Sequence, residues 1–330
     1  MKAVVCENWG DPAEVLQVRD LPTPEPARGQ VRVRMLVSPI NPSDLMMVRG
    51  RYGIKPLLPA VPGFEGVGVV EAGSGLPAWW RKNKRVVVPN GAGGNWAEQV
   101  VVPALQVWPA PAALTDEQAA TFFVNPASAV IMTRFVLAVP PDAWLLQTAA
   151  GSALGRMVIR LGRRYGFRTI NVVRRREQAE ELLREGADAV VATDAESLTE
   201  RVLALTNGAG VAYAIDCVGG PTGSEVVGVL ASGGRMLVYG TLSDEPLRID
   251  PRILIGGQKR IEGFWLSDWI RKQGILTKIS LFRTLGKLIQ TGLLATEVGA
   301  TFPLNDVRAA VRQAAQPGRQ GKVLLRIGSR

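Results

Sequence analysis

The feature that most limits the possible folds of this chain is a regular alternation of short apolar segments with amphipathic ones, from about residue 142 to about 267. The apolar segment 144–147 predicts a strand, and the apolar residues of 154–161 recur at i, i+3, i+4 and i+7, the pattern of one helix face. Further strands are expected over 169–173, 189–191, 212–218 and 235–239, and further helices over 177–185, 198–205 and 225–230. Repeated β-α units of this length predict a parallel, doubly wound α/β sheet.

The residues before this region follow a different pattern. The segment 31–37 alternates between apolar and polar residues with period two, and 67–70 and 85–88 are short apolar runs. Residues 1 to about 120 therefore predict a β-rich domain. Prolines are expected to prevent helices in its first part, and they are Pro22, Pro24, Pro26, Pro39 and Pro42.

Two further helices and one strand are expected outside these regions. The apolar stretch 121–139 contains Pro126 and Arg134, so it predicts a buried helix rather than a membrane span. After the alternating region, a long helix is expected over 275–290 and a last strand over 323–326.

Histidine is absent from all 330 residues. Its absence excludes the Ser-His-Asp triad, the Cys-His pair, an imidazole general base and a histidine-ligated zinc site. The two cysteines, Cys6 and Cys217, cannot build a disulfide framework or a four-cysteine zinc site. Proton chemistry must therefore use carboxylates, Lys, Cys, Ser, Thr or one of four tyrosines, and we expect no metal site.

The formal net charge is +10, from 39 basic and 29 acidic residues. This excess either keeps the surface soluble or attracts a polyanionic partner, such as nucleic acid, a phosphorylated cofactor or an acidic carrier protein. No basic run exceeds three residues, so an arm that binds nucleic acid is not indicated. The first residues predict a strand rather than an apolar leader, and we expect a soluble, cytoplasmic protein with neither nucleic acid nor membrane as a partner.

A run of small residues, Ala149–Gly155, lies between the first strand and the first helix of the alternating region. Such a turn lets a pyrophosphate approach the backbone N–H groups at the helix N-terminus. Its glycines are spaced G-x-x-x-G, because Ala153 stands where the G-x-G-x-x-G fingerprint has its middle glycine. Small residues are common in tight βα turns, but the strand before it and the amphipathic helix after it favour a dinucleotide site.

The end of the second strand of this region indicates which dinucleotide is bound. Enzymes that use NAD place Asp or Glu there to bind the ribose 2′-hydroxyl. Here Arg174, Arg175 and Arg176 follow the strand, and no acidic residue occurs before Glu177. Guanidinium groups pair with a phosphate, so NADPH is favoured over NADH. The alternative is a solvated charge run at the start of the next helix.

Tyr52 is the best candidate for a proton donor among the tyrosines. Tyr165 is expected at a helix end, Tyr213 inside a strand, and Tyr239 at a strand end where a loop can wrap the cofactor. Tyr52 lies in a polar loop flanked by glycines, and a phenol stays protonated at neutral pH, so it can donate to a carbonyl oxygen that becomes anionic. The alternative is a surface tyrosine that packs on Pro56.

The chain resembles the zinc-independent medium-chain dehydrogenases/reductases, and most closely the mitochondrial-type trans-2-enoyl-thioester reductases that act on enoyl-CoA or enoyl-acyl carrier protein. Quinone oxidoreductases of the same superfamily are also similar. The resemblance extends from residue 1 to Lys322 and rests on the motifs Asn41-Pro-Ser-Asp, Gly50-Arg-Tyr-Gly, Pro62-Gly-Phe-Glu-Gly, Val124-Asn-Pro, Ile170-Asn-Val-Val-Arg, Cys217-Val-Gly-Gly and Gly263-Phe-Trp-Leu-Ser-Asp-Trp. Zinc enzymes of the superfamily carry histidine at the position of Phe64.

The resemblance implies a GroES-like β-rich catalytic domain over 1–122, completed by 268–330, and a Rossmann-type NADP-binding domain over 123–267. It implies Tyr52 as the catalytic residue and usually a homodimer. The implied NADPH contacts are Asn125, Gly151, Ser152, Ala153, Leu154, Arg174, Arg175, Arg176, Tyr239, Gly240, Thr241, Leu242, Phe264, Trp265, Leu266 and Lys322. The residues expected to line the substrate pocket are Asn41, Trp265 and Trp269.

Two departures and several simpler interpretations accompany this assignment. Ala153 replaces a glycine of the family and Arg175 an acidic residue. Trp265 and Trp269 could be core aromatics at i and i+4, Asn125 could cap a helix, Lys322 could be an ordinary charge before a strand, and Cys217 is expected to be buried.

The first hypothesis is an NADPH-dependent reductase of the C=C bond of a 2-enoyl thioester, carried by CoA or by an acyl carrier protein in fatty acid metabolism. Its alternative is an NADPH:quinone oxidoreductase or another enone or acrylate reductase. A remote alternative is a non-enzymatic protein that binds nucleic acid or another partner on the same scaffold, for which the charge of +10 is the only support.

Overall fold

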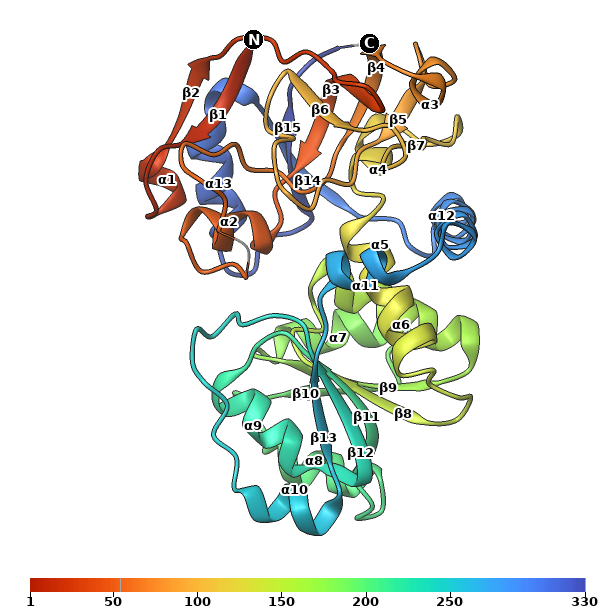
Figure 1. Ribbon diagram of the computed structural model, residues 1–330. Helices are drawn as coiled ribbons and strands as arrows, with labels where there is room; N and C mark the ends of the chain where they lie inside the picture. Colours follow the sequence, from red (N-terminus) through yellow and green to blue (C-terminus); the bar gives the residue numbers. More distant parts are fainter. Residues whose placement is uncertain (54, 330) are drawn as a thin grey trace. The chain divides into compact units, whose positions relative to one another are not determined.

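The computed structural model describes residues 1–53 and 55–329, apart from the side chains of Leu76 and Pro77. The chain divides into two compact units (Figure 1). Unit 1 consists of Met1–Asn125 and Ile279–Arg330, and unit 2 of Pro126–Lys278.

Unit 2 is built on a parallel sheet with the strand order β10-β9-β8-β11-β12-β13. The strands are β8 (Trp144–Gln147), β9 (Arg168–Val173), β10 (Ala189–Ala192), β11 (Val211–Asp216), β12 (Leu230–Val238) and β13 (Arg260–Gly263). The helices between them are α6 (Ala153–Tyr165), α7 (Glu177–Arg184), α8 (Leu198–Leu205), α9 (Gly220–Gly228) and α10 (Pro251–Gly257), and α11 (Leu266–Lys272) follows. The doubly wound α/β sheet expected from the sequence is confirmed.

Two apolar clusters among the described residues of unit 2 contain different helices. The first cluster joins apolar residues of the sheet with Val202 of α8 and Val226 of α9. The second joins Val173 of β9 with Ile159 of α6 and Leu182 of α7. Helices therefore cover both faces of the sheet, as a sheet buried on both sides requires (Figure 1).

Unit 1 contains a mixed, mostly antiparallel sheet with the order β14-β15-β3-β4-β5-β7, in which β6 also pairs with β3. Its strands are β3 (Gln30–Pro39), β4 (Val67–Gly73), β5 (Arg85–Val87), β6 (Gln99–Pro103), β7 (Trp108–Pro109), β14 (Val298–Pro303) and β15 (Lys322–Arg326). Strands β1 (Lys2–Cys6) and β2 (Leu16–Asp20) pair separately. Its helices are α1 (Pro12–Val15), α2 (Pro42–Val48), α3 (Leu76–Trp79), α4 (Asp116–Ala120), the short 3₁₀ helix Leu304–Asp306 and α13 (Val307–Ala315).

The C-terminal strands join the sheet that the first part of the chain forms in unit 1. Leu324 of β15 pairs with Pro39 of β3 in antiparallel register. The blue strands β14 and β15 thus complete a sheet whose other strands are red to yellow (Figure 1).

The chain passes between the units through α5 (Val124–Val130) and α12 (Ile275–Gln290). The helix expected over 121–139 is α5 followed directly by a π-helix over Ile131–Val136. π-Helical turns occur frequently near functional sites. No helix among the described residues is long and apolar enough to cross a membrane.

Both unit boundaries differ from those expected from the sequence. Residues 268–278, expected with the first domain, lie in unit 2, where Trp269 packs edge-on against Phe135 with ring centroids 5.6 Å apart. Residues 123–125, expected with the second domain, lie in unit 1, where the N–H groups of Phe123 and Val124 donate to the Glu65 carboxylate.

Two local expectations were wrong. Pro42 does not prevent a helix but occupies the first turn of α2, where its missing N–H removes no helical hydrogen bond. The polar loop expected to contain Tyr52 therefore begins only after α2. The helix expected over 225–230 is α9, which starts at Gly220, because Gly219 adopts a left-handed φ of 72° and lets the chain turn into the helix earlier.

Phe282 joins α12 to unit 1 by aromatic stacking. Its ring lies parallel to that of Trp108, with centroids 4.1 Å apart, and also stacks with Phe122 and Phe123 at 5.9 and 5.3 Å. The Phe282→Ala variant should lower the free energy of unfolding of unit 1 by about 3–5 kcal/mol in urea denaturation, because it opens a cavity among these rings.

Leu276 on the same helix provides the matched control, because its side chain is 79% exposed. Leu276→Ala should change the free energy of unfolding by about 0.5 kcal/mol or less. Equal effects of the two substitutions would contradict a role for the aromatic stack.

Candidate functional site

Residues expected at the site lie in both units. Asn41, Tyr52, Asn125 and Lys322 belong to unit 1, and the remainder belong to unit 2. The structure brings together residues within each group.

The group in unit 2 lies along the carboxyl ends of the parallel strands. In the sheet, β9 and β10 lie on one side of β8, and β11, β12 and β13 lie on its other side. The direction in which successive strands are added therefore reverses between β8 and β11. Open α/β sheets bind ligands at such a switch point. Gly151 follows β8, Arg174 follows β9, Tyr239 follows β12 and Phe264 follows β13.

The turn after β8 is shaped to bring backbone close to a ligand. Ala149 adopts a left-handed φ of 49°, and Ser152 caps α6 by accepting a hydrogen bond of 3.1 Å from the Gly155 N–H. A Cβ on Gly155 would lie 2.6 Å from Ala150 Cα, and a Cβ on Gly151 would lie 3.0 Å from Gln178 Nε2. Gly155 is thus required for packing, and the thirteen-residue helix α6 opens with its positive end at this turn.

A buried Thr–Asp pair joins this turn to the loop after β11. Thr148 Oγ1 donates to Asp216 Oδ1 at 2.6 Å and accepts from the Cys217 N–H at 3.1 Å. The carboxylate of Asp216 also accepts from the N–H groups of Val218 and Gly219, at 3.0 and 2.9 Å. One carboxylate therefore fixes the backbone on both sides of the switch point.

The segment Tyr239–Leu242 lies directly against this loop. The Tyr239 N–H donates to the Asp216 carbonyl at 2.8 Å, and the Leu242 N–H donates to the Cys217 carbonyl at 2.9 Å. A Cβ on Gly240 would lie 2.9 Å from Cys217 Cβ, so only glycine allows this approach. Thr241 and Leu242 are exposed.

Tyr239 and Cys217 turn their polar groups inward. Burial raises the pKa of the Cys217 thiol to about 11, and burial beside that thiol raises the pKa of the Tyr239 hydroxyl well above its ordinary value. Cys217 is buried, as the sequence indicated. Both groups remain protonated at neutral pH, so neither is a nucleophile or a base there.

Arg174, Arg175 and Arg176 are all exposed at the end of β9. Arg176 is the N-cap residue of α7, and its side chain makes no capping hydrogen bond. Within the described parts of the chain, none of the three guanidinium groups has a carboxylate partner. They form a cationic edge beside the glycine turn, and no acidic side chain that the structure describes pairs with it.

The aromatic segment after β13 begins with Phe264, whose N–H donates to the Val238 carbonyl at 2.8 Å. Trp265 is the N-cap of α11 and is 38% exposed. Leu266 opens the helix, and Trp269 packs against Phe135 of the π-helix. Phe135 was not expected from the sequence, since the π-helix that directs it is not visible in the apolar pattern.

In unit 1 the dominant feature is a buried polar network around Glu65. Its carboxylate accepts hydrogen bonds from the N–H groups of Phe123 and Val124, at 3.0 and 2.9 Å, and from Asn41 Nδ2, at 2.9 Å. Asn41 Oδ1 in turn accepts from the Lys322 ammonium at 2.6 Å. The amide of Asn41 thus bridges an anion and a cation that are both fully enclosed.

Asp44 forms the second half of this network. It accepts from the Asn41 N–H at 2.7 Å and from the Phe64 N–H at 3.0 Å. Burial raises the pKa of Asp44 to about 7, and burial also raises the pKa of Glu65. Burial lowers the pKa of Lys322 to about 8, although both carboxylates act in the opposite direction.

Tyr52 rests on this network through Phe64. The two rings are tilted by 36°, with centroids 5.0 Å apart, and the Phe64 N–H is the donor to Asp44. Tyr52 packs at the border of a buried cluster that includes Leu45 of α2. The tyrosine expected to be catalytic is therefore joined by one residue to a rigid, hydrogen-bonded frame.

Asn125 is the second residue of α5, not its cap. It directly follows Val124, whose N–H is bound by Glu65. The same carboxylate therefore fixes the backbone beside Asn125 and the side chain of Asn41.

Asp44 and Glu65 were not expected among the functional residues, although both lie in motifs that carry the resemblance. The signal for Glu65 in the sequence was an acidic residue two positions before the apolar segment 67–70. The partners that explain it lie 24 and 59 residues away in sequence.

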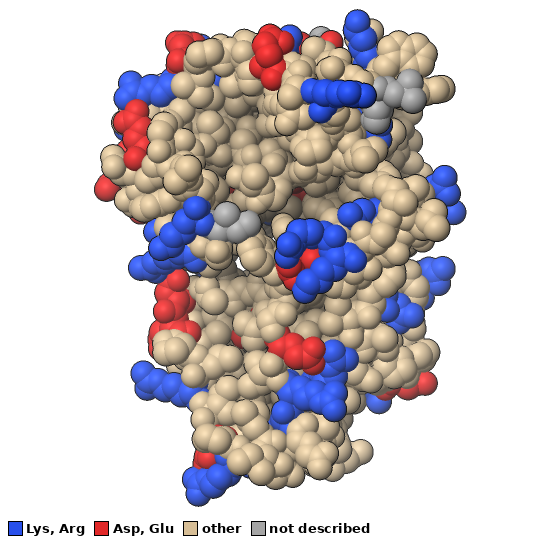
Figure 2. Space-filling view, in the orientation of Figure 1, with Lys and Arg blue, Asp and Glu red and all other residues tan. Residues whose placement is uncertain are grey.

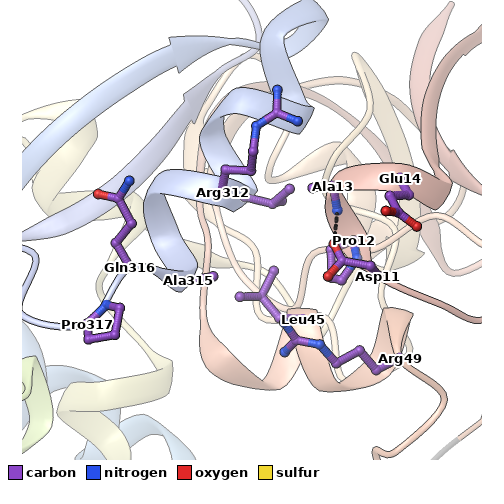
Figure 3. A pocket seen from close by; sticks show the side chains of 11 residues that line it. Asp11, Pro12, Ala13, Glu14, Leu45, Arg49, Arg312, Ala315, Gln316 and Pro317 are labelled. Carbon is purple, nitrogen blue, oxygen red and sulfur yellow. Dashed lines mark hydrogen bonds between the residues drawn. The ribbon is translucent and has the colours of Figure 1, made fainter.

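A pocket of about 430 Å³ in unit 1 lies among α1, α2 and α13, apart from the residues expected at the site. Its lining includes Arg49, Arg312 and Leu45 (Figure 3). The Asp11 side chain turns back to accept from the Ala13 N–H at 2.7 Å, as the dashed line shows. We assign no function to this pocket.

The charge of the chain is not gathered into one large basic surface on the face in view. Figure 2 shows Lys and Arg side chains scattered over that face with Asp and Glu among them. Among the described residues there is also no group of three or more His, Cys, Asp and Glu side chains that could hold a metal ion.

Comparison with known proteins agrees with this architecture. Residues 27–112 match the family model of the alcohol dehydrogenase GroES-like domain, and residues 153–281 match that of zinc-binding dehydrogenases. The chain is 33% identical over 335 residues to mitochondrial enoyl-[acyl-carrier-protein] reductase of Homo sapiens, covering 98% of this chain and 88% of that protein.

Two crystal structures of quinone oxidoreductases have the same fold. That of Escherichia coli, complexed with NADPH, has a TM-score of 0.91 and 26% identity, and the match covers 99% of this chain and 100% of that one. That of Thermus thermophilus has a TM-score of 0.81 and 29% identity, with the same coverage.

The network around Glu65 predicts a pH dependence of stability. The pKa of Lys322 is about 8 in the folded chain, whereas an ordinary lysine, as in the unfolded chain, has a pKa of 10.5. Between pH 8 and pH 10.5 the unfolded chain therefore binds one more proton at this residue than the folded chain. The free energy of unfolding should therefore rise with pH in this window, by up to about 3 kcal/mol.

This contribution can be isolated by urea denaturation at pH 8, 9 and 10. The Lys322→Met variant should lack the rise, whereas Lys287→Met, which removes an exposed lysine, should keep it. Parallel pH profiles for the wild type and Lys322→Met would contradict the burial of a charged ammonium group.

Proposed function

This chain belongs to the medium-chain dehydrogenase/reductase superfamily and is an oxidoreductase, and on that premise we propose that it reduces the C=C bond of a 2-enoyl thioester with NADPH. The observation that carries the substrate class is the identity of 33% over 98% of the chain with a reductase named for an enoyl-acyl carrier protein. The thioester is carried by CoA or by an acyl carrier protein. In this proposal the protein acts in fatty acid metabolism as a cytoplasmic homodimer.

The residues of unit 2 fit a dinucleotide. The turn after β8 combines Gly151, Gly155 and the capped N-terminus of a long helix, which together leave room for a pyrophosphate near backbone N–H groups. The segment Tyr239–Leu242 and the residues from Phe264 to Leu266 border the same edge of the sheet.

The exposed arginines support NADPH over NADH. Arg174, Arg175 and Arg176 have no carboxylate partner among the described residues, so they are available to a 2′-phosphate. A bare ribose hydroxyl would gain little from three cations, and no acidic side chain stands at this position to accept from it.

The chemistry divides between the cofactor and Tyr52. When bound, NADPH supplies the hydride, which attacks the β-carbon of the enoyl group. The Tyr52 hydroxyl donates a hydrogen bond to the thioester oxygen as negative charge develops on it. The same hydroxyl supplies or relays the proton that the α-carbon takes up, so one hydride and one proton add across the double bond.

The network beneath Tyr52 holds its supporting residues still. Asp44 fixes the N–H of Phe64, on which the tyrosine packs, and Glu65 fixes the backbone before Asn125. A donor held by packing needs little reorganisation when charge develops on the substrate. Asn41 and Lys322 act within this network as positioning residues.

The residues present do not fit zinc. The chain has no histidine, its two cysteines are buried in different units, and the described residues hold no cluster of possible ligands. The zinc in the name of the matching family model is therefore not carried over to this chain.

A second candidate is reduction of quinones or other enones, which the fold of the quinone oxidoreductase structures favours. The first test is oxidation of NADPH, followed by its absorbance, with crotonyl-CoA or a simple quinone as acceptor. Faster turnover of crotonyl-CoA supports the thioester, and turnover of the quinone alone would overturn it.

Neutralising the arginines should weaken NADPH binding selectively. The variants to compare are Arg174→Gln, Arg175→Gln and Arg176→Gln. A variant that removes a phosphate contact should raise the Kd of NADPH by about 10- to 100-fold and leave the Kd of NADH unchanged. Arg184→Gln, an exposed residue at the end of α7, serves as the control. Equal Kd values for both cofactors in the wild type would refute the assignment.

Replacing the phenol should affect turnover rather than cofactor binding. Tyr52→Phe should lower kcat with crotonyl-CoA by about 10²- to 10³-fold and change the Kd of NADPH less than about twofold. Tyr165→Phe, which removes a hydroxyl at the end of α6, should have no effect on kcat. An undiminished kcat in Tyr52→Phe would show that another group assists at the carbonyl.

A further inference from the structure

Two neighbouring tryptophans are exposed on unit 1, outside the candidate site. Trp79 and Trp80 are 69% and 61% exposed, and their rings meet edge to face with centroids 5.3 Å apart. Exposed aromatic groups of this size are costly in water, and contiguous apolar patches usually mark an interaction surface.

The segment that carries them is anchored to the sheet of unit 1. Ala78 is buried in the apolar cluster beneath it. After the tryptophans, Asn83 adopts a left-handed φ of 60°, and its N–H donates to the Val70 carbonyl of β4 at 2.9 Å. The tryptophans are therefore held at the surface by a tight turn.

Two lysines follow the tryptophans in the same turn. The Lys82 N–H donates to the Trp79 carbonyl at 3.3 Å, and the Lys84 N–H donates to the Arg81 carbonyl at 3.0 Å, so the backbone of both lysines is held close to that of the aromatic pair. Arg28 lies on the adjoining strand segment, where Gly29 donates to the Ser74 carbonyl at 2.9 Å. We call Arg28, Trp79, Trp80, Lys82 and Lys84 the Trp79 patch.

The charges of the Trp79 patch are uncompensated. Arg28, Lys82 and Lys84 are exposed, and within the described ranges none of them pairs with a carboxylate. The nearby acids have other partners, since Glu71 pairs with Arg34 at 3.0 Å and Asp116 with Arg85 at 2.7 Å. The patch therefore offers indole rings and free cations together.

We propose that the Trp79 patch docks this protein onto the surface of an anionic phospholipid bilayer. Indole rings lie preferentially at the headgroup level, where the ring is apolar and its N–H remains hydrated. Lysine and arginine nearby are attracted to anionic headgroups. No membrane partner was expected from the sequence because no segment was expected to span a bilayer, and a surface patch needs no spanning segment.

An acidic carrier protein is the competing occupant. A carrier that delivers a tethered acyl chain must dock close to the catalytic residues, whereas α3 lies on the side of unit 1 opposite to α2, the helix that precedes Tyr52 in the chain (Figure 1). The Trp79 patch also projects from a turn rather than lining a groove. Its position and composition therefore favour a lipid surface, and this inference stands whether or not the proposed reduction is correct.

Cosedimentation with vesicles tests the proposal on the full chain. The protein should bind vesicles that contain about one-third phosphatidylglycerol in phosphatidylcholine, bind pure phosphatidylcholine much more weakly, and be released by salt. Its tryptophan fluorescence should shift to shorter wavelength on binding.

Two double variants separate the two parts of the patch. Lys82→Gln/Lys84→Gln should lower the partition coefficient about fivefold for each lysine. Trp79→Ser/Trp80→Ser should lower it at least about tenfold and abolish the fluorescence shift. Both pairs are exposed, so the variants should fold like the wild type, which circular dichroism verifies.

The control variants match these changes elsewhere on the surface. Arg283→Gln/Lys287→Gln removes the same charge from α12, and Leu183→Ser removes an apolar side chain that is 50% exposed on α7. Neither should change vesicle binding by more than about twofold.

Three outcomes would overturn the proposal. The first is no binding to anionic vesicles at low salt. The second is binding that the patch variants and the control variants weaken equally. The third is binding to a purified acidic carrier protein, lost in Trp79→Ser/Trp80→Ser, without binding to vesicles.

Discussion

Glu65 is the residue on which the rest of unit 1 depends. An enclosed carboxylate costs several kcal/mol unless every oxygen is paired, and here two backbone N–H groups and the Asn41 amide pair it. Because these donors come from β3–α2 and from the entry to α5, satisfying one charge fixes two distant segments at once. Lys322 adds the C-terminal strand, so a third distant segment of the chain joins the same network.

Unit 2 uses a carboxylate in a similar way. Asp216 binds Thr148 and the N–H groups after β11, so the loops on both sides of the switch point share one acceptor. The two units differ in what surrounds the carboxylate. At the switch point of unit 2, Gly155 and Gly240 allow backbone segments to approach each other closely. This edge of the sheet therefore presents backbone N–H groups and exposed arginines, whereas the charges of the Glu65 network are enclosed. Unit 1 fixes side chains, and unit 2 shapes a backbone surface.

Periodicity revealed the parts of the fold that depend on local burial. The helix over 275–290 has the expected bounds, and the alternation after residue 142 predicted the parallel sheet. Partners distant in sequence remained invisible, since Lys322 meets Asn41 across 281 positions. The rule that proline prevents a helix also failed at Pro42. Proline breaks a helix in its interior but is favoured in the first turn, which is where Pro42 lies in α2. The chemical roles of the site residues remain predictions.

The absence of histidine makes the choice of proton donor unusually narrow. Cys217 and Tyr239 keep their protons because burial raises the pKa of each, and the Tyr239 hydroxyl is enclosed within unit 2. Asp44 and Glu65 are occupied by N–H donors that the fold needs. A group suited to assist at a developing oxyanion must be only partly buried and held by packing, and Tyr52, which packs on Phe64, meets both conditions.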